Sequence, residues 1–351
     1  GSWRRHCQTR LREPQSGRHC LPGAPRRPPT GSQRHEGRAS QREERVKIRR
    51  ICILGGTGFV GHHLSSHLAA QGYACRVLTR HPQRHRDLQL LPGSDLVGGD
   101  IFQPDALRGH FTGCEAVINL VGILNQRAPR ETFRRLHVEL VEAIVEAGRR
   151  AGIRRYLHMS AVNADAANGK SEYLRSKGEG ESRAHTLGQA AMKVTSFRPS
   201  VVFGPGDSFF NRFAGLLRLS PGVMPLACPN ARFAPVYVGD LVAAMTRALE
   251  DPTTWGRHYD LCGPGSYTLQ ELVRYSAKTL GLRRWVLGLG DFSSRMQARL
   301  FQHLPGKPFT MDNYLSLQTD SVCPENGLEA LGIDPTPLEA IVPEYLTPRA
   351  G

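Results

Sequence analysis

The sequence lacks any apolar run that approaches the roughly 18 residues needed to cross a bilayer as a helix. Its longest mostly apolar stretch, 116–124, has the length of a buried strand, so we expect no transmembrane segment. It also lacks an internal repeat. A chain of 351 residues with 40% hydrophobic and 22% charged residues is typical of a globular protein with a sizeable core.

The sequence has no closely spaced cysteine pair of the CxxC type. Its eight cysteines are scattered, at positions 7, 20, 52, 75, 114, 228, 262 and 323. Cys52 and Cys75 lie in apolar, strand-like runs, which is typical of buried thiols. The pattern therefore predicts neither a zinc site nor a disulfide framework, and it indicates a reducing compartment such as the cytoplasm.

Lysine and apolar periodicity are missing from residues 1–45, which hold 11 arginines, four glutamates and five prolines. Such a segment cannot bury a core, so we expect a disordered basic extension. Binding to nucleic acid or an anionic surface is one interpretation, and an arginine-rich transit peptide is another, although the prolines oppose an amphipathic helix. We favour a third: Gly1-Ser2 resembles a cloning scar, and the natural sequence starts near Val46. No nucleic-acid partner is expected.

A glycine cluster follows the apolar run 51–54 and opens into a helical pattern over 59–71. Strand, tight turn and helix N-terminus in this order favour anion binding, because the first helical N–H groups have no partner and the helix dipole is positive there. Glycines at positions 55, 58 and 61 allow close approach of a pyrophosphate. The predicted phosphate-binding residues are Gly55, Thr57, Gly58, Phe59, Val60 and Gly61.

The second predicted strand, 74–79, has no carboxylate at its end. In a dinucleotide-binding fold an acidic residue there binds the ribose 2′-hydroxyl. Here Arg80 occupies that region and is suited to a 2′-phosphate, so we predict NADP(H) over NAD(H), the alternative being a solvated loop charge. Asp100, after the third strand, is expected to accept a hydrogen bond from the adenine amino group.

Strands are further predicted at 116–122, 154–159 and 192–198, alternating with helices that include a long one over about 130–151. Val121 and Gly122 are expected to bring backbone close to the cofactor. Six strands alternating with helices indicate an α/β protein with a Rossmann-type, doubly wound parallel sheet.

The regular alternation fails beyond residue 205. We expect the dinucleotide-binding domain to span 46–205. The remainder, 206–351, is expected to form mostly a small C-terminal lid domain that carries the substrate, with a segment near 236–262 returning to the sheet.

Ser160, Tyr173 and Lys177 form the most informative constellation. Ser160 follows a strand, and Tyr173 and Lys177 share a helix face at spacing i, i+4, with Ser171 as the helix N-cap. An ammonium lowers the pKa of a nearby phenol, so we expect Tyr173 to act as acid or base with Lys177 as its partner. Lys177 also suits the nicotinamide ribose, and Ser160 a substrate carbonyl. The alternative is a pair of ordinary helix-surface residues.

The glycine turn, Asp100, Ser160 and the Tyr173–Lys177 pair carry a family resemblance. On these motifs, residues 47–349 resemble the extended or atypical short-chain dehydrogenases/reductases. The runs 158–161, 173–179, 234–240 and 267–269 resemble one branch of the NAD-dependent epimerase/dehydratase proteins, the bacterial relatives of the nucleotide-binding accessory subunit of respiratory complex I. The resemblance implies a bound NADP(H), which in that branch can be purely structural. It also implies a role near complex I or ubiquinone-pathway assembly, and so peripheral association with the inner membrane or a respiratory complex.

Three further candidates are weaker. His63 and His67 form an i, i+4 pair with no third metal ligand nearby, so packing or surface roles are expected and no metal is predicted. Asp240 either caps its helix or binds substrate. A set of apolar residues either lines an apolar substrate pocket or forms lid core: Phe209, Phe210, Leu216, Leu217, Met224, Trp285 and Phe292.

Together these observations favour an NADP(H)-dependent oxidoreductase acting on a carbonyl or hydroxyl group of an apolar, quinone- or lipid-like small molecule. A non-catalytic NADP(H)-binding assembly factor or accessory protein is the second hypothesis. A sugar-nucleotide epimerase/dehydratase is the third, and the short spacing between Ser160 and Tyr173 weakens it.

Overall fold

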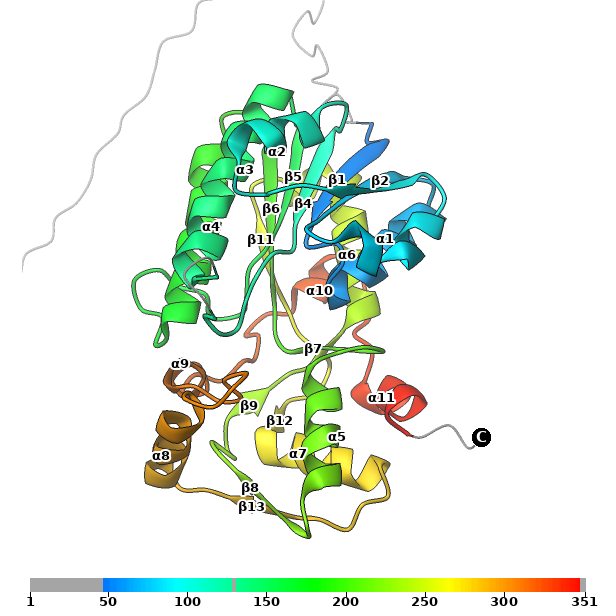
Figure 1. Cartoon of the computed structure of the whole chain (residues 1–351). Coiled ribbons are helices and arrows are strands. Elements are labelled where there is room, and N and C mark those ends of the chain that lie inside the picture. Colours follow the sequence, from blue (N-terminus) through cyan, green and yellow to red (C-terminus); the bar gives the residue numbers. More distant parts are fainter. Residues whose placement is uncertain (1–46, 128–130, 348–351) are drawn as a thin grey trace, which may run out of the picture. The chain divides into compact units, whose positions relative to one another are not determined.

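The computed structural model describes residues 47–127 and 131–347, which belong to one compact unit that begins at Glu44 (Figure 1). The expectations for residues 1–45 therefore lie outside the described residues. Within the described residues no helix is long and apolar enough to span a membrane.

A seven-stranded parallel sheet organises this unit. Its spatial order is β11-β6-β5-β4-β1-β2-β3, and every neighbouring pair is parallel. The strands are β1 (Arg50–Leu54), β2 (Ala74–Thr79), β3 (Ser94–Gly98), β4 (Ala116–Asn119), β5 (Arg155–Met159), β6 (Lys193–Pro199) and β11 (His258–Leu261). This confirms the predicted doubly wound fold. The winding direction reverses between β1 and β4, and ligands of such sheets bind at the carboxyl ends of the strands beside that reversal.

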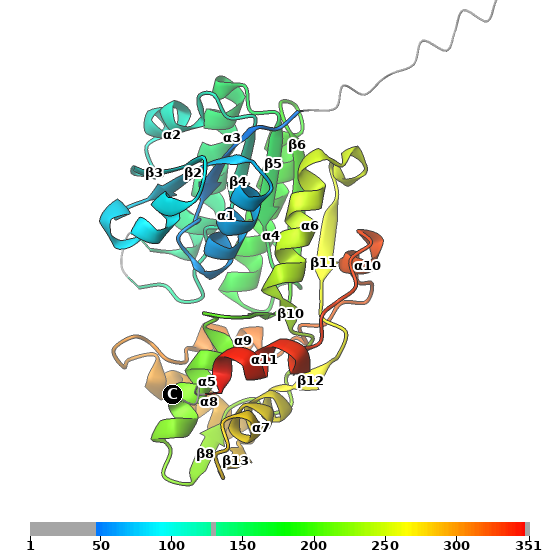
Figure 2. The ribbon, with the colours of Figure 1, turned by 90° about the vertical axis from the view of Figure 1, so that its right-hand side faces the viewer.

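Helices cover both faces of the sheet (Figure 2). Helices α1 (Phe59–Ala70) and α6 (Val238–Glu250) share one apolar core with the sheet, and α2 (Pro104–Phe111), α3 (Leu140–Ala151) and α4 (Glu172–Gly188) share the core on the other face. The strands are buried on both faces, which explains their near-continuous apolar runs.

Several boundaries differ from the sequence prediction. The strand predicted at 116–122 ends at Asn119, because the side chain of Asn119 accepts the N–H of Val121 at 3.1 Å and the chain leaves the ladder. The long helix begins as a π-helical segment, Arg134–Glu139, and continues as α3. Between β2 and β3 the chain forms two 3₁₀ turns, Pro82–Arg84 and Arg86–Leu90.

The C-terminal part has a separate apolar core, which includes Phe203, Phe210, Leu272 and Val342. The elements are β7 (Val202–Phe203), α5 (Phe209–Leu219), β8 (Val223–Leu226), β9 (Arg232–Phe233), β10 (Val236–Tyr237), β12 (Tyr267–Thr268), α7 (Leu269–Thr279), β13 (Trp285–Gly288), α8 (Asp291–Phe301), α9 (Met311–Ser316), α10 (Gly327–Ala330) and α11 (Leu338–Leu346). Thr268 and Glu271 form a capping box at the start of helix α7.

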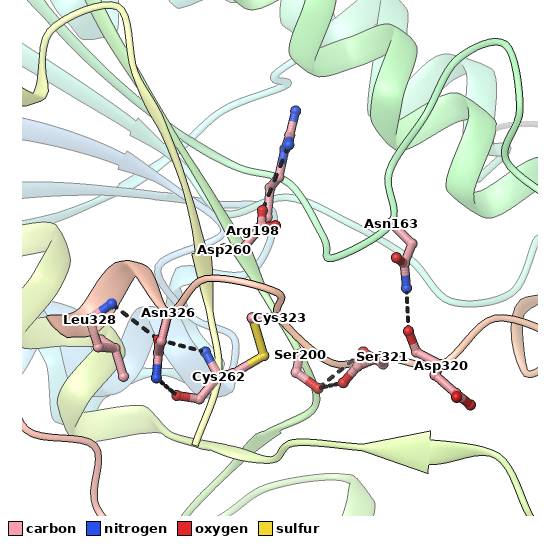
Figure 3. Close-up of a disulfide and its surroundings, with 10 residues drawn as sticks. All are labelled: Asn163, Arg198, Ser200, Asp260, Cys262, Asp320, Ser321, Cys323, Asn326 and Leu328. Atoms are coloured by element: carbon pink, nitrogen blue, oxygen red, sulfur yellow. Dashed lines mark hydrogen bonds and ion pairs between the residues drawn. A yellow bond between two sulfur atoms is a disulfide. The ribbon is translucent and has the colours of Figure 1, made fainter. Parts of the chain in front are cut away.

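The expectation of no disulfide is wrong. Cys262, directly after β11, is bonded to Cys323 in the segment between α9 and α10 (Figure 3). The bond joins residues 61 positions apart, a pairing that local spacing does not reveal. Asn326 binds both backbone groups of Cys262, so the same segment is held at a second point. The buried thiols predicted at Cys52 and Cys75 are confirmed, and Cys114 is a further buried thiol.

Replacing Cys262 by serine should lower the free energy of unfolding by about 3–4 kcal/mol, since the bond closes a long loop in the unfolded chain. Urea denaturation with and without a reducing agent measures this. Cys228→Ser, at a partly buried free thiol, is the control and should change little. A reducing agent that destabilised the Cys262→Ser variant as much as the wild type would contradict the prediction.

Candidate functional site

The glycine turn between β1 and α1 admits no larger side chains. A Cβ atom at Gly61 would lie 2.3 Å from the carbonyl oxygen of Gly55, and Gly55 itself has a φ of +77°. Helix α1 starts after Gly58 without a side-chain cap and without an acidic residue in its first turn. Its first N–H groups therefore remain available to an anion, and the cradle fits a pyrophosphate.

The end of β2 places Arg80 and Asp100 at the same edge of the sheet, because β2 and β3 are neighbours. The Arg80 side chain is 70% exposed and forms an ion pair with Glu131 at 3.2 Å. Asp100 is exposed, and its Oδ1 accepts the N–H of Phe102 at 3.0 Å, which closes the turn after β3.

Lys177 of α4 reaches the carboxyl end of β5, where Ser160 follows Met159, and Tyr173 lies one helical turn before Lys177. Lys177 is buried, and its Nζ donates to the carbonyl oxygen of Met159 at 2.5 Å, so α4 is held against the residue that precedes Ser160. Ser171 caps α4 as predicted, accepting the N–H of Leu174 at 3.1 Å. The hydroxyl of Ser160 is buried and has no partner among the described residues, as a group that awaits a ligand would be.

The backbone after β4 reaches the same place. A Cβ added at Gly122 would lie 3.7 Å from the Nζ of Lys177. Val121, next to it, donates its N–H to the side chain of Asn119. The glycine cradle at the end of β1 and the Ser160–Lys177 group at the end of β5 thus flank β4, within one strand of each other in the sheet.

The ionisation of this group differs from the sequence expectation. Burial, together with the charge of Asp312, raises the pKa of Tyr173 to about 12. Burial lowers the pKa of Lys177 to about 8, partly opposed by Glu181. The predicted lowering of the Tyr173 pKa is therefore wrong in this structure, because burial and the charge of Asp312 both raise it. Tyr173 is a phenol with a proton to donate.

Sequence reasoning missed His137, which lies in the π-helical segment. Its ring stands edge-on to the Tyr173 ring, with centroids 5.7 Å apart. Its Nε2 accepts the N–H of Ile123 at 3.2 Å, so its Nδ1 carries the proton and donates to the hydroxyl of Ser176 at 2.8 Å. Burial and the charge of Lys177 lower the pKa of His137 to about 2, so the ring stays neutral.

His137 therefore ties the loop after β4 to helix α4. The Ser176 hydroxyl in turn donates a hydrogen bond to the carbonyl oxygen of Tyr173 at 2.9 Å, so the hydrogen-bond chain from His137 ends on the backbone of Tyr173. The available sequence signal was a lone histidine one helical turn after Phe133, on the apolar face of the long helix.

Asp312 of α9 is a second residue that sequence reasoning missed. Its carboxylate accepts the backbone N–H groups of Glu172 at 2.7 Å and Tyr173 at 3.2 Å, at the start of α4. A cavity of about 350 Å³ lies beside it, lined by Asn125, Gln126, Phe133, Gln302, His303, Lys307, Thr310 and Asp312. Phe133 also contacts Tyr173, with ring centroids 5.9 Å apart. Phe133 and Asp312 thus connect Tyr173 to this cavity, and seven of its eight lining residues have polar side chains.

The apolar substrate pocket suggested by sequence is not formed by the residues named for it. Phe210, Leu217 and Met224 are buried in the C-terminal core, and Phe209 packs against it. Three others are exposed: Leu216, Trp285 and Phe292.

The two remaining candidates have structural partners. Asp240 neither caps α6 nor faces the cavity, because its carboxylate accepts the N–H and hydroxyl of Thr336. His63 contacts the carbonyl oxygen of Pro205 at 3.0 Å. Among the described residues no cluster of three metal-ligating side chains exists.

A doubly wound parallel sheet with a glycine cradle beside its reversal point defines a Rossmann-type dinucleotide-binding protein. The chain belongs to the NAD-dependent epimerase/dehydratase family, whose family model matches residues 51–262. This confirms the resemblance found in the sequence.

Two relatives bear on the function. The chain is 30% identical over 298 residues to mitochondrial NADH dehydrogenase [ubiquinone] 1 alpha subcomplex subunit 9 of Mus musculus, covering 82% of this chain and 77% of the mouse protein. It is 31% identical over 244 residues to a ceramide reductase of Caulobacter vibrioides, covering 69% and 74% of the two chains.

Solved structures share the fold. The NADPH-dependent quinone oxidoreductase of Escherichia coli, determined with NADPH, superposes with a TM-score of 0.67 at 17% identity, covering 84% of this chain and 99% of that one. The UDP-glucose 4-epimerase of Thermotoga maritima superposes with a TM-score of 0.67 at 16% identity, covering 85% and 97%.

Proposed function

We propose that the protein is an NADP(H)-dependent oxidoreductase that reduces a carbonyl group on a lipid-like substrate. The observation that carries the proposal is that buried Lys177 reaches the end of β5, where the Ser160 hydroxyl has no partner among the described residues. Protonated Tyr173 lies one helical turn before Lys177 on α4 and supports the same proposal. The ceramide reductase relative supports a lipid-like substrate. The polar cavity beside Tyr173 suits the polar head of such a molecule.

The chain's own residues divide the work. Backbone N–H groups between Gly55 and Gly61 would hold the pyrophosphate, Arg80 the 2′-phosphate and Asp100 the adenine. Val121, Gly122 and Lys177 would border the nicotinamide end. When bound, NADPH supplies the hydride.

At the substrate, Ser160 donates a hydrogen bond to the carbonyl oxygen and orients it. Tyr173 then donates its proton to that oxygen as the alcohol forms. The ammonium of Lys177 stabilises the phenolate that remains on Tyr173.

The reduction rate should fall as the pH rises above about 8, the pKa of Lys177, because a neutral amine no longer stabilises the phenolate. A pH profile of kcat for NADPH oxidation measures this. Lys177→Arg keeps the charge at every accessible pH, so its profile should lose the descending limb near pH 8. The same descending limb in both proteins would contradict the assignment.

Cofactor preference should follow Arg80. Arg80→Asp should weaken NADPH binding by about tenfold or more while changing NADH binding little, since a 2′-phosphate contact is charge-assisted. Glu131→Gln releases Arg80 from its ion pair and should strengthen NADPH binding a few-fold, because an exposed ion pair costs up to about 1 kcal/mol to open. Titration calorimetry with both cofactors measures these changes, and equal losses for NADPH and NADH would contradict the 2′-phosphate role.

A second candidate function is a non-catalytic NADP(H)-binding accessory or assembly protein associated with a respiratory complex. The similarity to the mouse complex I subunit supports it. A sugar-nucleotide substrate is supported by the fold likeness alone.

One experiment separates the candidates. The purified protein is stripped of nucleotide, reloaded with NADPH and offered carbonyl compounds from lipid, quinone and sugar-nucleotide classes. Exchangeable NADPH that is oxidised with a long-chain ketone supports the reductase. Nucleotide that neither exchanges nor is oxidised with any of the three substrate classes would contradict the enzyme hypothesis and favour the accessory role.

A further inference from the structure

The β8–β13 strand pair, labelled in Figure 1, carries large exposed apolar side chains on one face. The register places Trp285 opposite Val223 and Leu287 opposite Pro225. The alternate residues, Met224, Leu226 and Val286, point the other way into the C-terminal core. Trp285 is 81% exposed, although a two-sided strand pair normally turns polar side chains to water.

Helix α8 follows β13 after two residues and carries an exposed apolar row of its own. Phe292, Met296 and Leu300 follow one another at spacing i, i+4 and are 77%, 49% and 64% exposed. Ser294 and Ala298 on the same helix are buried, so the apolar row is the outward face. Isolated exposed apolar residues are ordinary, but rows on adjoining elements mark an interaction surface.

Basic side chains accompany these rows. A depression of about 530 Å³ beside Trp285 is lined by residues that include Arg274, Lys278, Arg283 and Arg284. Residues 272–306 contain six arginines and lysines and a single acidic residue, Asp291. In the part of the chain that the structure describes, none of the six forms an ion pair.

We propose that this basic-apolar face, formed by the β8–β13 outer residues, the α8 apolar row and the adjoining basic depression, binds an anionic lipid bilayer. Tryptophan and aliphatic side chains on one surface enter the headgroup–acyl boundary, and arginines beside them meet lipid phosphates. Unbalanced positive charge complements an anionic membrane, to which each basic residue adds attraction. A folded protein partner would need acidic side chains at fixed positions opposite the basic residues. A bilayer needs no such fixed positions, because its anionic headgroups and apolar acyl layer meet the basic and apolar side chains wherever they lie on the face. The proposal does not depend on whether the site turns over a substrate.

Vesicle flotation of the full chain tests the proposal. Phosphatidylcholine vesicles are compared with vesicles that contain about 30% phosphatidylglycerol, at low and high salt. We expect binding to the anionic vesicles alone, weakened by salt. The double variant Arg274→Glu, Lys278→Glu should bind at least about tenfold more weakly, since both side chains are exposed. Trp285→Ser should bind several-fold more weakly.

Matched variants lie on the sheet-bearing part of the chain. Leu90→Ser removes another exposed apolar side chain, at 84% exposure, and Arg108→Glu with Arg154→Glu reverses two exposed charges. Both controls should bind like the wild type. Circular dichroism checks that each variant is folded, and quenching of Trp285 fluorescence by brominated lipid gives a second readout in the wild type.

Four results would overturn the proposal. Binding that the face variants leave unchanged would assign it to the arginine-rich residues 1–45, which every variant retains. Equal losses in the control charge variant would mean unspecific attraction. Binding of inorganic pyrophosphate without vesicle binding would make the depression a site for free phosphates. A dimer that Trp285→Ser dissociates, without vesicle binding, would assign the face to a second copy.

Discussion

Replacing Tyr173 by phenylalanine should lower kcat for carbonyl reduction by about 10²–10⁴-fold, the usual contribution of a positioned general acid. Phenylalanine keeps the ring that packs edge-on against the stacked rings of Phe133 and His137, so the local structure should persist. It removes only the hydroxyl that donates the proton. Steady-state rates of NADPH oxidation measure the loss, and the dissociation constant of NADPH should stay within a few-fold of the wild type.

Tyr73→Phe is the matched control for this change. Tyr73 is another partly buried tyrosine with a raised pKa, but its hydroxyl donates to Glu250 on α6, away from the site. Its kcat should remain unchanged. If Tyr173→Phe reduced the substrate as fast as Tyr73→Phe, Tyr173 would have no catalytic role.

Replacing Gly61 by alanine should weaken dinucleotide binding by about 10²-fold or more, because the backbone must move to relieve a severe overlap. The new methyl group would lie 2.3 Å from the carbonyl oxygen of Gly55 and 2.4 Å from the Cα of Gly56. Both belong to the turn that forms the cradle, so relief of the overlap deforms the anion site itself. Fluorescence titration with NADPH and NADH measures the loss, which should be similar for the two cofactors.

Gly215→Ala tests whether a loss of binding comes from the cradle or from general destabilisation. Gly215 lies in α5, and a Cβ there meets nothing within 4 Å. Alanine at that position should stabilise the helix by about 0.5–1 kcal/mol and leave binding unchanged. Wild-type affinity in the Gly61→Ala variant would contradict the assignment of the pyrophosphate to this turn.

Local pattern was enough to predict the sheet. Each strand reads as a short apolar run followed by a turn, and each covering helix shows an apolar stripe, so position and type follow from near-neighbour residues. The cradle was predictable for the same reason, since strand, turn and helix are contiguous at 51–61. Strand boundaries differed from the prediction where a side chain bonded to the backbone. At the end of β4, for example, the Asn119 side chain accepts the N–H of Val121 and the strand stops before the predicted residue 122.

The surroundings of the site were not predictable in this way. His137 and Asp312 lie 36 residues before and 139 residues after Tyr173, and no local period links them to it. The disulfide between Cys262 and Cys323 depends on a segment returning to the end of β11. The direction of the Tyr173 pKa depended on how much protein covers the ring, which a motif does not contain.

The sequence by itself determined the α/β class and the glycine turn, and it predicted the pairing of Tyr173 with Lys177, because each rests on residues adjacent in the chain or one helical turn apart. Only the tertiary structure decided that Tyr173 keeps its proton, that a polar cavity adjoins it, and that Trp285 and Phe292 face outward. Desolvation, cavities and exposed faces arise from contacts between distant segments, and the folded chain alone defines these contacts.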